Sequence, residues 1–145
     1  MYNHLLTAYD GSEIAQKALR QGIELAQIHN AKLTVVTVTE PWHAFSAGET
    51  TVSFPIDEYE TNVTKWADGA LNEAREMAAE AGVDCQALHV DNKYPAEGIL
   101  ETAARENCDL IVMASHGHRG LTRLLLGSQA TQVVTHSDRP VLICR

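Results

Sequence analysis

One segment near the end of the chain combines glycine, serine and basic residues at spacings that suit phosphate binding. It spans residues 114–128 and contains Gly117, Gly120 and Gly127. Glycine permits positive φ angles and lets the backbone approach a ligand closely, so successive N–H groups can surround an anion. Gly127 and Ser128 also precede a helical pattern, and the N–H groups at the start of a helix attract phosphate. The segment therefore predicts a phosphate site, although turn glycines and a serine helix cap would give the same pattern.

Asp10 is a second candidate ligand residue, in the turn Asp10-Gly11-Ser12 that follows a short apolar segment. A carboxylate can accept hydrogen bonds from the hydroxyl groups of a ligand. The same turn is also explained by helix capping, because aspartate and serine are both favoured where a helix begins. Both interpretations remain open, and we favour the ligand role for Asp10.

Basic residues and histidines lie inside the glycine-rich segment. Arg119 and Arg123 could offset the charge of a bound phosphate chain, and a position on a solvated face explains them equally well. His116 and His118 form an HxH pair, but no third ligand stands at a helpful spacing. The sequence therefore predicts no metal site built from protein side chains.

The aromatic residues divide into two groups. Trp66 belongs to an apolar stripe with helical spacing, so we expect it to pack against the core rather than contact a ligand. Trp42, Phe45 and Phe54 lie in a long irregular segment, residues 40–55. There they could cover a ligand, contact a second subunit or form a local cluster that fixes the loop.

The elements that must position these residues alternate between strand and helix patterns. Short β-branched or apolar runs predict strands at residues 4–9, 32–39, 83–90, 108–114 and 140–144. Apolar residues at steps of three and four predict helices at residues 13–30, 56–81, 95–106 and 129–136. This alternation predicts a parallel sheet covered on both faces, with ligands bound beyond the carboxyl ends of the strands.

Composition limits the possible functions. The chain has 145 residues, 45% of them hydrophobic, which suits one soluble domain. No apolar stretch approaches the roughly 20 residues that span a bilayer, and the amino terminus does not resemble a secretory signal, so we expect a cytoplasmic protein without membrane insertion. A net charge of −8 disfavours nucleic acid as a partner. The three cysteines lack CxxC spacing and are expected to be buried free thiols.

Over its whole length the chain resembles the universal stress protein family in its ATP-binding branch. The family signature is glycine, two residues, glycine, nine residues, then glycine with serine or threonine. Here Gly117 and the pair Gly127-Ser128 keep that spacing, and Ala114 replaces the first glycine. The start LLTAYDGSE and the end DRPVLICR also match. The added methyl of Ala114 costs little if its φ is ordinary and strains the loop if φ is positive.

The resemblance implies a doubly wound five-stranded parallel sheet of order 3-2-1-4-5, with helices on both faces, in one nucleotide-binding domain of residues 1–145. ATP would lie across the ends of the first and fourth strands, with Mg or Mn held mainly by its phosphates. The residues implied to contact the nucleotide are Ala8, Asp10, Val38, Met113, Ala114, Gly117, Arg119, Gly127, Ser128 and Gln129.

The resemblance also implies a nucleotide-dependent regulatory or stress-response protein that forms a homodimer through its last strand. A tetramer and a protein partner such as a membrane transporter are further expectations. A dedicated enzyme is disfavoured, because the chain has no GxxxxGK[ST] motif, no G-x-S-x-G motif and no lysine after Lys93. The alternatives are a slow ATPase and a nucleotide-free dimeric interaction module.

Overall fold

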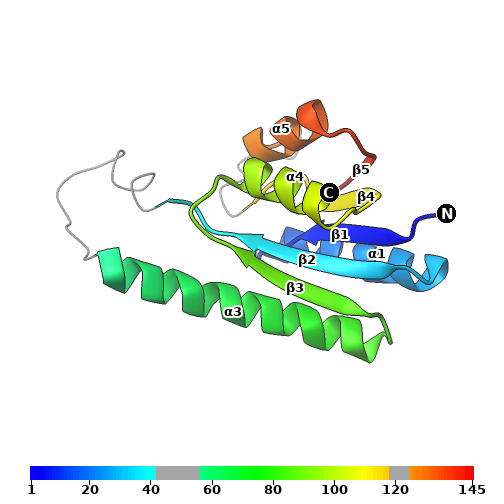
Figure 1. Ribbon diagram of the computed structural model, residues 1–145, viewed down its shortest axis with the longest axis horizontal. Coiled ribbons are helices and arrows are strands. Elements are labelled where there is room, and N and C mark those ends of the chain that lie inside the picture. The colour runs from blue at the N-terminus through cyan, green and yellow to red at the C-terminus, as the bar shows by residue number, and fades with distance from the viewer. Residues whose placement is uncertain (42–55, 118–124) are drawn as a thin grey trace.

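A five-stranded parallel sheet forms the centre of the protein in the computed structural model, which describes residues 1–41, 56–117 and 125–145 (Figure 1). The strands are β1 (His4–Ala8), β2 (Lys32–Val38), β3 (Cys85–Val90), β4 (Leu110–Ala114) and β5 (Val141–Cys144). Their order is β3-β2-β1-β4-β5, and every neighbouring pair is parallel. This order confirms the predicted fold class.

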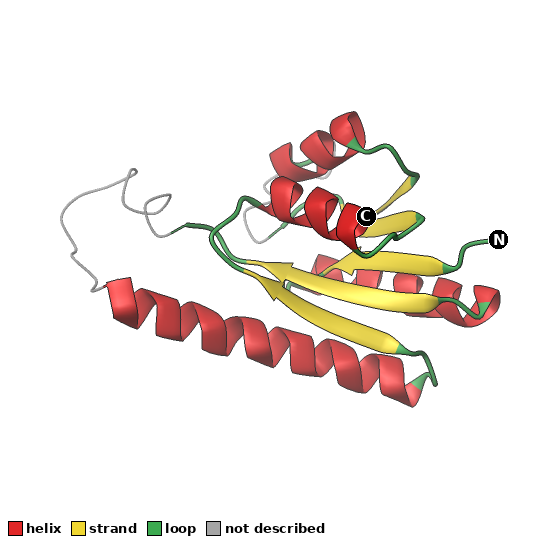
Figure 2. Cartoon of the chain, viewed as in Figure 1, coloured by secondary structure: helices red, strands yellow, loops and turns green. Residues whose placement is uncertain are grey.

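Helices cover both faces of the sheet (Figure 2). They are α1 (Glu13–His29), α3 (Ile56–Glu80), α4 (Pro95–Arg105) and α5 (Ser128–His136). One apolar cluster lies on each face of the sheet. Helices α1 and α3 contribute to the first cluster, and α4 and α5 contribute to the second. In β1, Leu5 belongs to the first cluster and Leu6 to the second, as expected when successive side chains point to opposite faces.

The helix ends follow the predicted signals closely. Ser12 caps α1 by accepting a hydrogen bond from the Ala15 amide at 3.2 Å, and Asn30 ends the helix with φ 52°. Gly82 follows α3 with φ +69°. The strand predicted at 108–114 begins at Leu110, and the preceding Asp109 accepts hydrogen bonds from the amides of Asn3 and His4 at 2.8 and 3.2 Å.

The three cysteines are free, as predicted, but only Cys108 is buried. Cys85 and Cys144 are half-buried because they lie on the outer strands β3 and β5. Burial raises the pKa of Cys108 to about 11, and it raises the pKa of Cys85 and of Cys144 as well. The thiols therefore remain protonated at neutral pH.

Within the described part of the chain, no helix combines the length and the apolar character needed to cross a membrane.

Close contact between α1 and β1 depends on Gly22. A Cβ atom added at Gly22 would overlap Thr7 Oγ1, and Thr7 is fully buried. Because the backbone of α1 packs directly on the Thr7 side chain at this point, α1 lies close to the sheet.

We predict that Gly22→Ala lowers the free energy of unfolding by roughly 1–3 kcal/mol, because overpacking outweighs the gain of about 1 kcal/mol in helix propensity. Gly69→Ala in α3 is the matched control, since no atom lies within 4 Å of its added methyl, and it should stabilise the protein by about 0.5–1 kcal/mol. Chemical denaturation measures both. Equal effects of the two substitutions would contradict this account of the α1 contact.

Candidate functional site

A cavity of about 760 Å³ opens at the carboxyl edge of the sheet, where β1 and β4 are neighbours. The chain leaves β1 toward α1 on one face and leaves β4 toward α5 on the other, so the cavity lies where the strand order reverses. The predicted residues that line it are Ala8, Asp10, Val38, Met113, Ala114, Gly117, Gly127, Ser128 and Gln129. Arg119 lies outside the described residues, as do Arg123, His118 and the aromatic residues predicted in segment 40–55.

The glycine-rich segment returns to its starting point through one hydrogen bond. The Gly127 amide donates to the Ser115 carbonyl at 2.8 Å, and the Ser115 amide donates to the Cys144 carbonyl at 2.8 Å. A Cβ atom on Gly127 would lie 3.1 Å from Ser115 O and 3.5 Å from His116 Cα. The close approach of the two backbones therefore favours glycine at this position.

Gly117 and Gly127 do not adopt the positive φ angles that glycine permits. Gly127 has φ −60°, and Gly117 is not among the residues with positive φ. A Cβ atom on Gly117 would lie 3.3 Å from Asp10 Oδ2, so close approach again accounts for the glycine. Close approach therefore accounts for glycine at both positions, and neither position uses the positive φ that glycine permits.

Helix α5 begins at the cavity without a side-chain cap. Gly127 occupies the N-cap position, and no side chain accepts a hydrogen bond there. Ser128 is the first residue of the helix and therefore not its cap, contrary to one of the two predicted roles. The first N–H groups of α5 thus face a cavity with the partial positive charge of the helix dipole.

Ala114 replaces the first signature glycine without straining the backbone. It lies at the end of β4 opposite Cys144, is buried, and is not among the residues with positive φ. Its methyl group lines the cavity. The departure from the glycine signature therefore has little structural cost.

Asp10 both shapes its turn and faces the cavity. Its Oδ1 accepts a hydrogen bond from the Ser12 amide at 2.9 Å, while Ser12 itself caps α1. Its Oδ2 lies beside Gly117. Asp10 follows β1 and Gly117 follows the neighbouring strand β4, so the two residues meet across the ends of these strands. The structure therefore shows the turn role of Asp10, and its ligand role stays a prediction.

Tyr9 connects the end of β1 to α3, a role that its sequence position did not reveal. Its hydroxyl donates to Glu73 at 2.8 Å, and Gln16 donates to the same carboxylate at 3.0 Å. Burial raises the pKa of Tyr9 to about 12, and Glu73 adds to the shift through its hydrogen bond and charge. Tyr9 remains a hydrogen-bond donor, so α3 stays attached to the strand that carries Asp10.

Ser115 and His116 also line the cavity, and sequence reasoning considered His116 only as a metal ligand. Ser115 Oγ and His116 Nδ1 lie 3.0 Å apart, which fixes the orientation of the imidazole ring. Among the described residues, no group of three histidine, cysteine or carboxylate side chains could hold a metal ion.

Trp66 contradicts its predicted role in the core. It is 42% exposed and lines the cavity, because α3 passes the edge of the sheet at this point and only Ala67 and later residues are buried against it. Tyr94, which precedes α4, is 48% exposed and lines the cavity too. Sequence reasoning gave Tyr94 no role.

The charged side chains around the cavity are acidic in the part of the chain that the structure describes. Asp10 and Glu40 line it, and no lysine or arginine does. An anionic ligand must therefore rely here on backbone N–H groups and on the α5 dipole.

Gln129 uses its side chain to join the two helices on one face. Its Oε1 accepts a hydrogen bond from the Ala96 amide at 2.9 Å, near the start of α4. Tyr94 occupies the N-cap position of α4 and makes no capping hydrogen bond. Gln129 therefore caps α4 from α5, which leaves its backbone amide for any contact with phosphate.

Comparison with known proteins gives consistent matches over the full length. The model of the universal stress protein family matches residues 1–145. Universal stress protein YxiE of Bacillus subtilis is 35% identical, with 100% of both chains covered. Among solved structures, protein MJ0577 is 26% identical with a TM-score of 0.84, covering 99% of this chain and 96% of that one. A universal stress protein solved in complex with cAMP is 26% identical with a TM-score of 0.75, covering 99% and 97%.

We predict that Gln129→Ala lowers the free energy of unfolding by about 1 kcal/mol, the usual cost of removing a helix cap. Gln132→Ala is the matched control, because Gln132 lies exposed on the same helix. Urea denaturation of the two variants measures the difference. If both variants were as stable as the wild type, Gln129 would not cap α4.

Proposed function

This chain belongs to the universal stress protein family, and we propose that it binds ATP in the cavity at the ends of β1 and β4. In this proposal it is a cytoplasmic regulatory or stress-response protein whose nucleotide state controls a partner. The observation that carries the proposal is the uncapped start of α5, which faces the cavity beside Gly127. A cavity of about 760 Å³ falls within the usual range for small-molecule sites, roughly 300–1,000 Å³.

The phosphates are proposed to lie at the start of α5. The amides of Ser128 and Gln129 are among the first N–H groups of that helix, and Gly117 faces them across the same cavity. Backbone donors and the helix dipole suit an anion, and they compensate for the lack of basic side chains among the described lining residues.

The base and ribose are proposed to lie toward β1 and β2. Ala8, Val38 and Met113 give that part of the cavity an apolar surface, and Asp10 provides a carboxylate oxygen beside Gly117. The 26% identical relative solved with cAMP supports an adenine nucleotide as the class of ligand.

A divalent cation would accompany ATP mainly through phosphate and water oxygens. The described residues offer no cluster of metal-binding side chains. The carboxylate of Asp10 lies beside Gly117 and lines the cavity. Mg²⁺ typically keeps several waters and binds through phosphates and one or two carboxylates, so this arrangement fits Mg²⁺ and, by the same oxygen chemistry, Mn²⁺.

Regulation is a better proposal than catalysis. Besides a divalent ion, efficient phosphoryl transfer needs a lysine or arginine on the phosphates and a group that orients the nucleophile, and no lysine or arginine lines the described cavity. Slow hydrolysis remains the enzymatic alternative. The nucleotide-free module is weakened as an alternative, because Ala114 strains no backbone.

A homodimer through β5 is also proposed. β5 is an outer strand of the sheet, and Leu142 on it and Val134 on α5 are exposed. An apolar edge strand is a pairing hazard unless another chain covers it. Light scattering of the purified chain should give twice the mass of one chain, and the mass of one chain would contradict this assembly.

We predict that nucleotide released from the denatured purified protein includes about one ATP per chain, and that Gly127→Val abolishes it. The valine side chain would collide with the Ser115 carbonyl and His116, and it would displace the start of α5. Mass spectrometry of the released nucleotide measures this.

Gly69→Val is the matched control, because no atom lies within 4 Å of a Cβ added at Gly69 in α3, and it should leave bound ATP unchanged. A wild-type protein that carries no ATP and fails to bind added ATP would refute the proposal in favour of the nucleotide-free module.

A further inference from the structure

Two partly exposed aromatic side chains meet the cavity from opposite layers of the protein. Trp66 comes from α3, which packs on one face of the sheet, and Tyr94 comes from the start of α4, on the other face. They are 42% and 48% exposed. Large aromatic side chains at the rim of a cavity expose apolar faces that a planar ligand can cover.

The position of Tyr94 is unusual for its residue type. It is the N-cap of α4, where serine, threonine, aspartate and asparagine are favoured, and its side chain makes no capping hydrogen bond. Gln129 provides the missing acceptor to the Ala96 amide from another helix. A local preference that is broken at the rim of a cavity, and compensated from elsewhere, is expected at a functional position.

The backbone around Tyr94 is held firmly beside the end of β2. The Gly98 amide donates to the Tyr94 carbonyl at 3.0 Å, and Pro95 restricts the first residue of the helix. Gly98 lies against Val38 so closely that an added Cβ would be 2.7 Å from a Val38 methyl. Tyr94 is therefore fixed relative to Val38, which lines the apolar part of the cavity.

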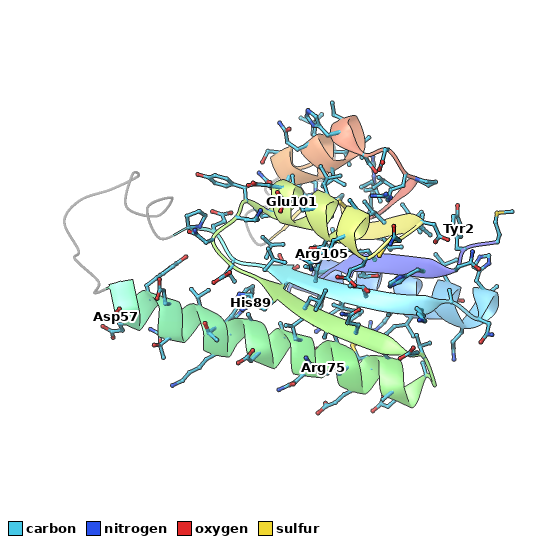
Figure 3. All side chains as sticks on the ribbon, viewed as in Figure 1. Tyr2, Asp57, Arg75, His89, Glu101 and Arg105 are labelled. Carbon is cyan, nitrogen blue, oxygen red and sulfur yellow. The ribbon has the colours of Figure 1, made fainter. Side chains whose placement is uncertain are left out.

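Trp66 reaches the same cavity from α3, which packs on the other face of the sheet. The first turns of α3 extend beyond the carboxyl ends of β2 and β3, as the labelled Asp57 shows (Figure 3). Tyr59, Val63 and Trp66 follow one another at steps of four and three, so they share one face of α3. The Tyr59 hydroxyl donates to the Glu40 carbonyl at 3.1 Å, which ties this face to the segment after β2.

We propose that Trp66 and Tyr94 both contact the base of the bound nucleotide and provide much of its affinity by stacking. The inference rests on the proposed function and adds the two side chains that recognise the base. Stacking suits this site, because its described lining has two carboxylates and no lysine or arginine to attract phosphate. Aromatic contact is indifferent to the number of phosphates, so the same two residues act on AMP and on ATP.

The test measures dissociation constants of ATP and AMP by calorimetry for the wild type, Trp66→Ala and Tyr94→Ala. Each alanine substitution should raise the dissociation constants of both nucleotides by about tenfold, the usual effect of losing one base-stacking side chain. Trp66→Phe should retain most of the affinity, because a phenyl ring still stacks. Tyr2→Ala is the aromatic control, because Tyr2 lies at the amino ends of the strands, away from the cavity (Figure 3). This variant should bind both nucleotides as the wild type does.

A second readout does not depend on comparing variants for stability. Trp42 and Trp66 are the two tryptophans of the chain, so Trp42→Phe leaves Trp66 as the single reporter. Its fluorescence should change on titration with AMP, with a midpoint equal to the calorimetric constant, and should not change with tripolyphosphate.

The outcomes separate the two claims. If the wild type binds neither nucleotide, the proposed function fails and this inference fails with it. If the wild type binds ATP but either alanine variant binds it equally well, or if Trp66 fluorescence ignores AMP, only the stacking inference is overturned.

Discussion

The Gly127 amide donates to the Ser115 carbonyl at 2.8 Å, and the rest of the site depends on this contact. It brings the chain back to the end of β4 after the glycine-rich segment, so that α5 starts beside the strand it has just left. Because Ser115 is bonded in turn to Cys144 on β5, the outer strand, the loop base and the helix start form one hydrogen-bonded unit. A Cβ atom at position 127 would lie only 3.1 Å from the Ser115 carbonyl oxygen, so this close approach favours glycine.

The sheet provides the second constraint, and it was the part most readily predicted from sequence. β-branched runs such as residues 32–38 are buried on both faces, and this composition distinguishes them from the helices whose apolar residues recur at three and four. Ser12, Asn30 and Gly82 mark helix ends by local chemistry that needs no tertiary information. The turns after β1, β2 and β4 could also be singled out, because ligands of open parallel sheets bind beyond the carboxyl ends of the strands, and the resemblance to the family then indicated the individual residues.

What the sequence could not provide was set by contacts between distant segments. Trp66 fits a helical apolar stripe, yet it is exposed. Its burial depends on how α3 lies across β2 and β3, because the sheet does not extend beneath the first turns of the helix. Gln129 caps α4 from 33 positions away, and Tyr94 occupies an N-cap position for which its type is a poor candidate. Ala114 could be judged only when its place in β4 was known. Each case needed the relative placement of two elements, which periodicity does not encode.

The central claim is that phosphate binds to the open start of α5, and amide hydrogen exchange followed by NMR with and without ATP tests it most directly. The account predicts that ATP slows exchange at the amides of Ser128 and Gln129 and leaves the far end of the sheet, at Lys32, unchanged. Saturating ATP that leaves those two amides unprotected would contradict the account, because the nucleotide would then be held somewhere other than the start of this helix.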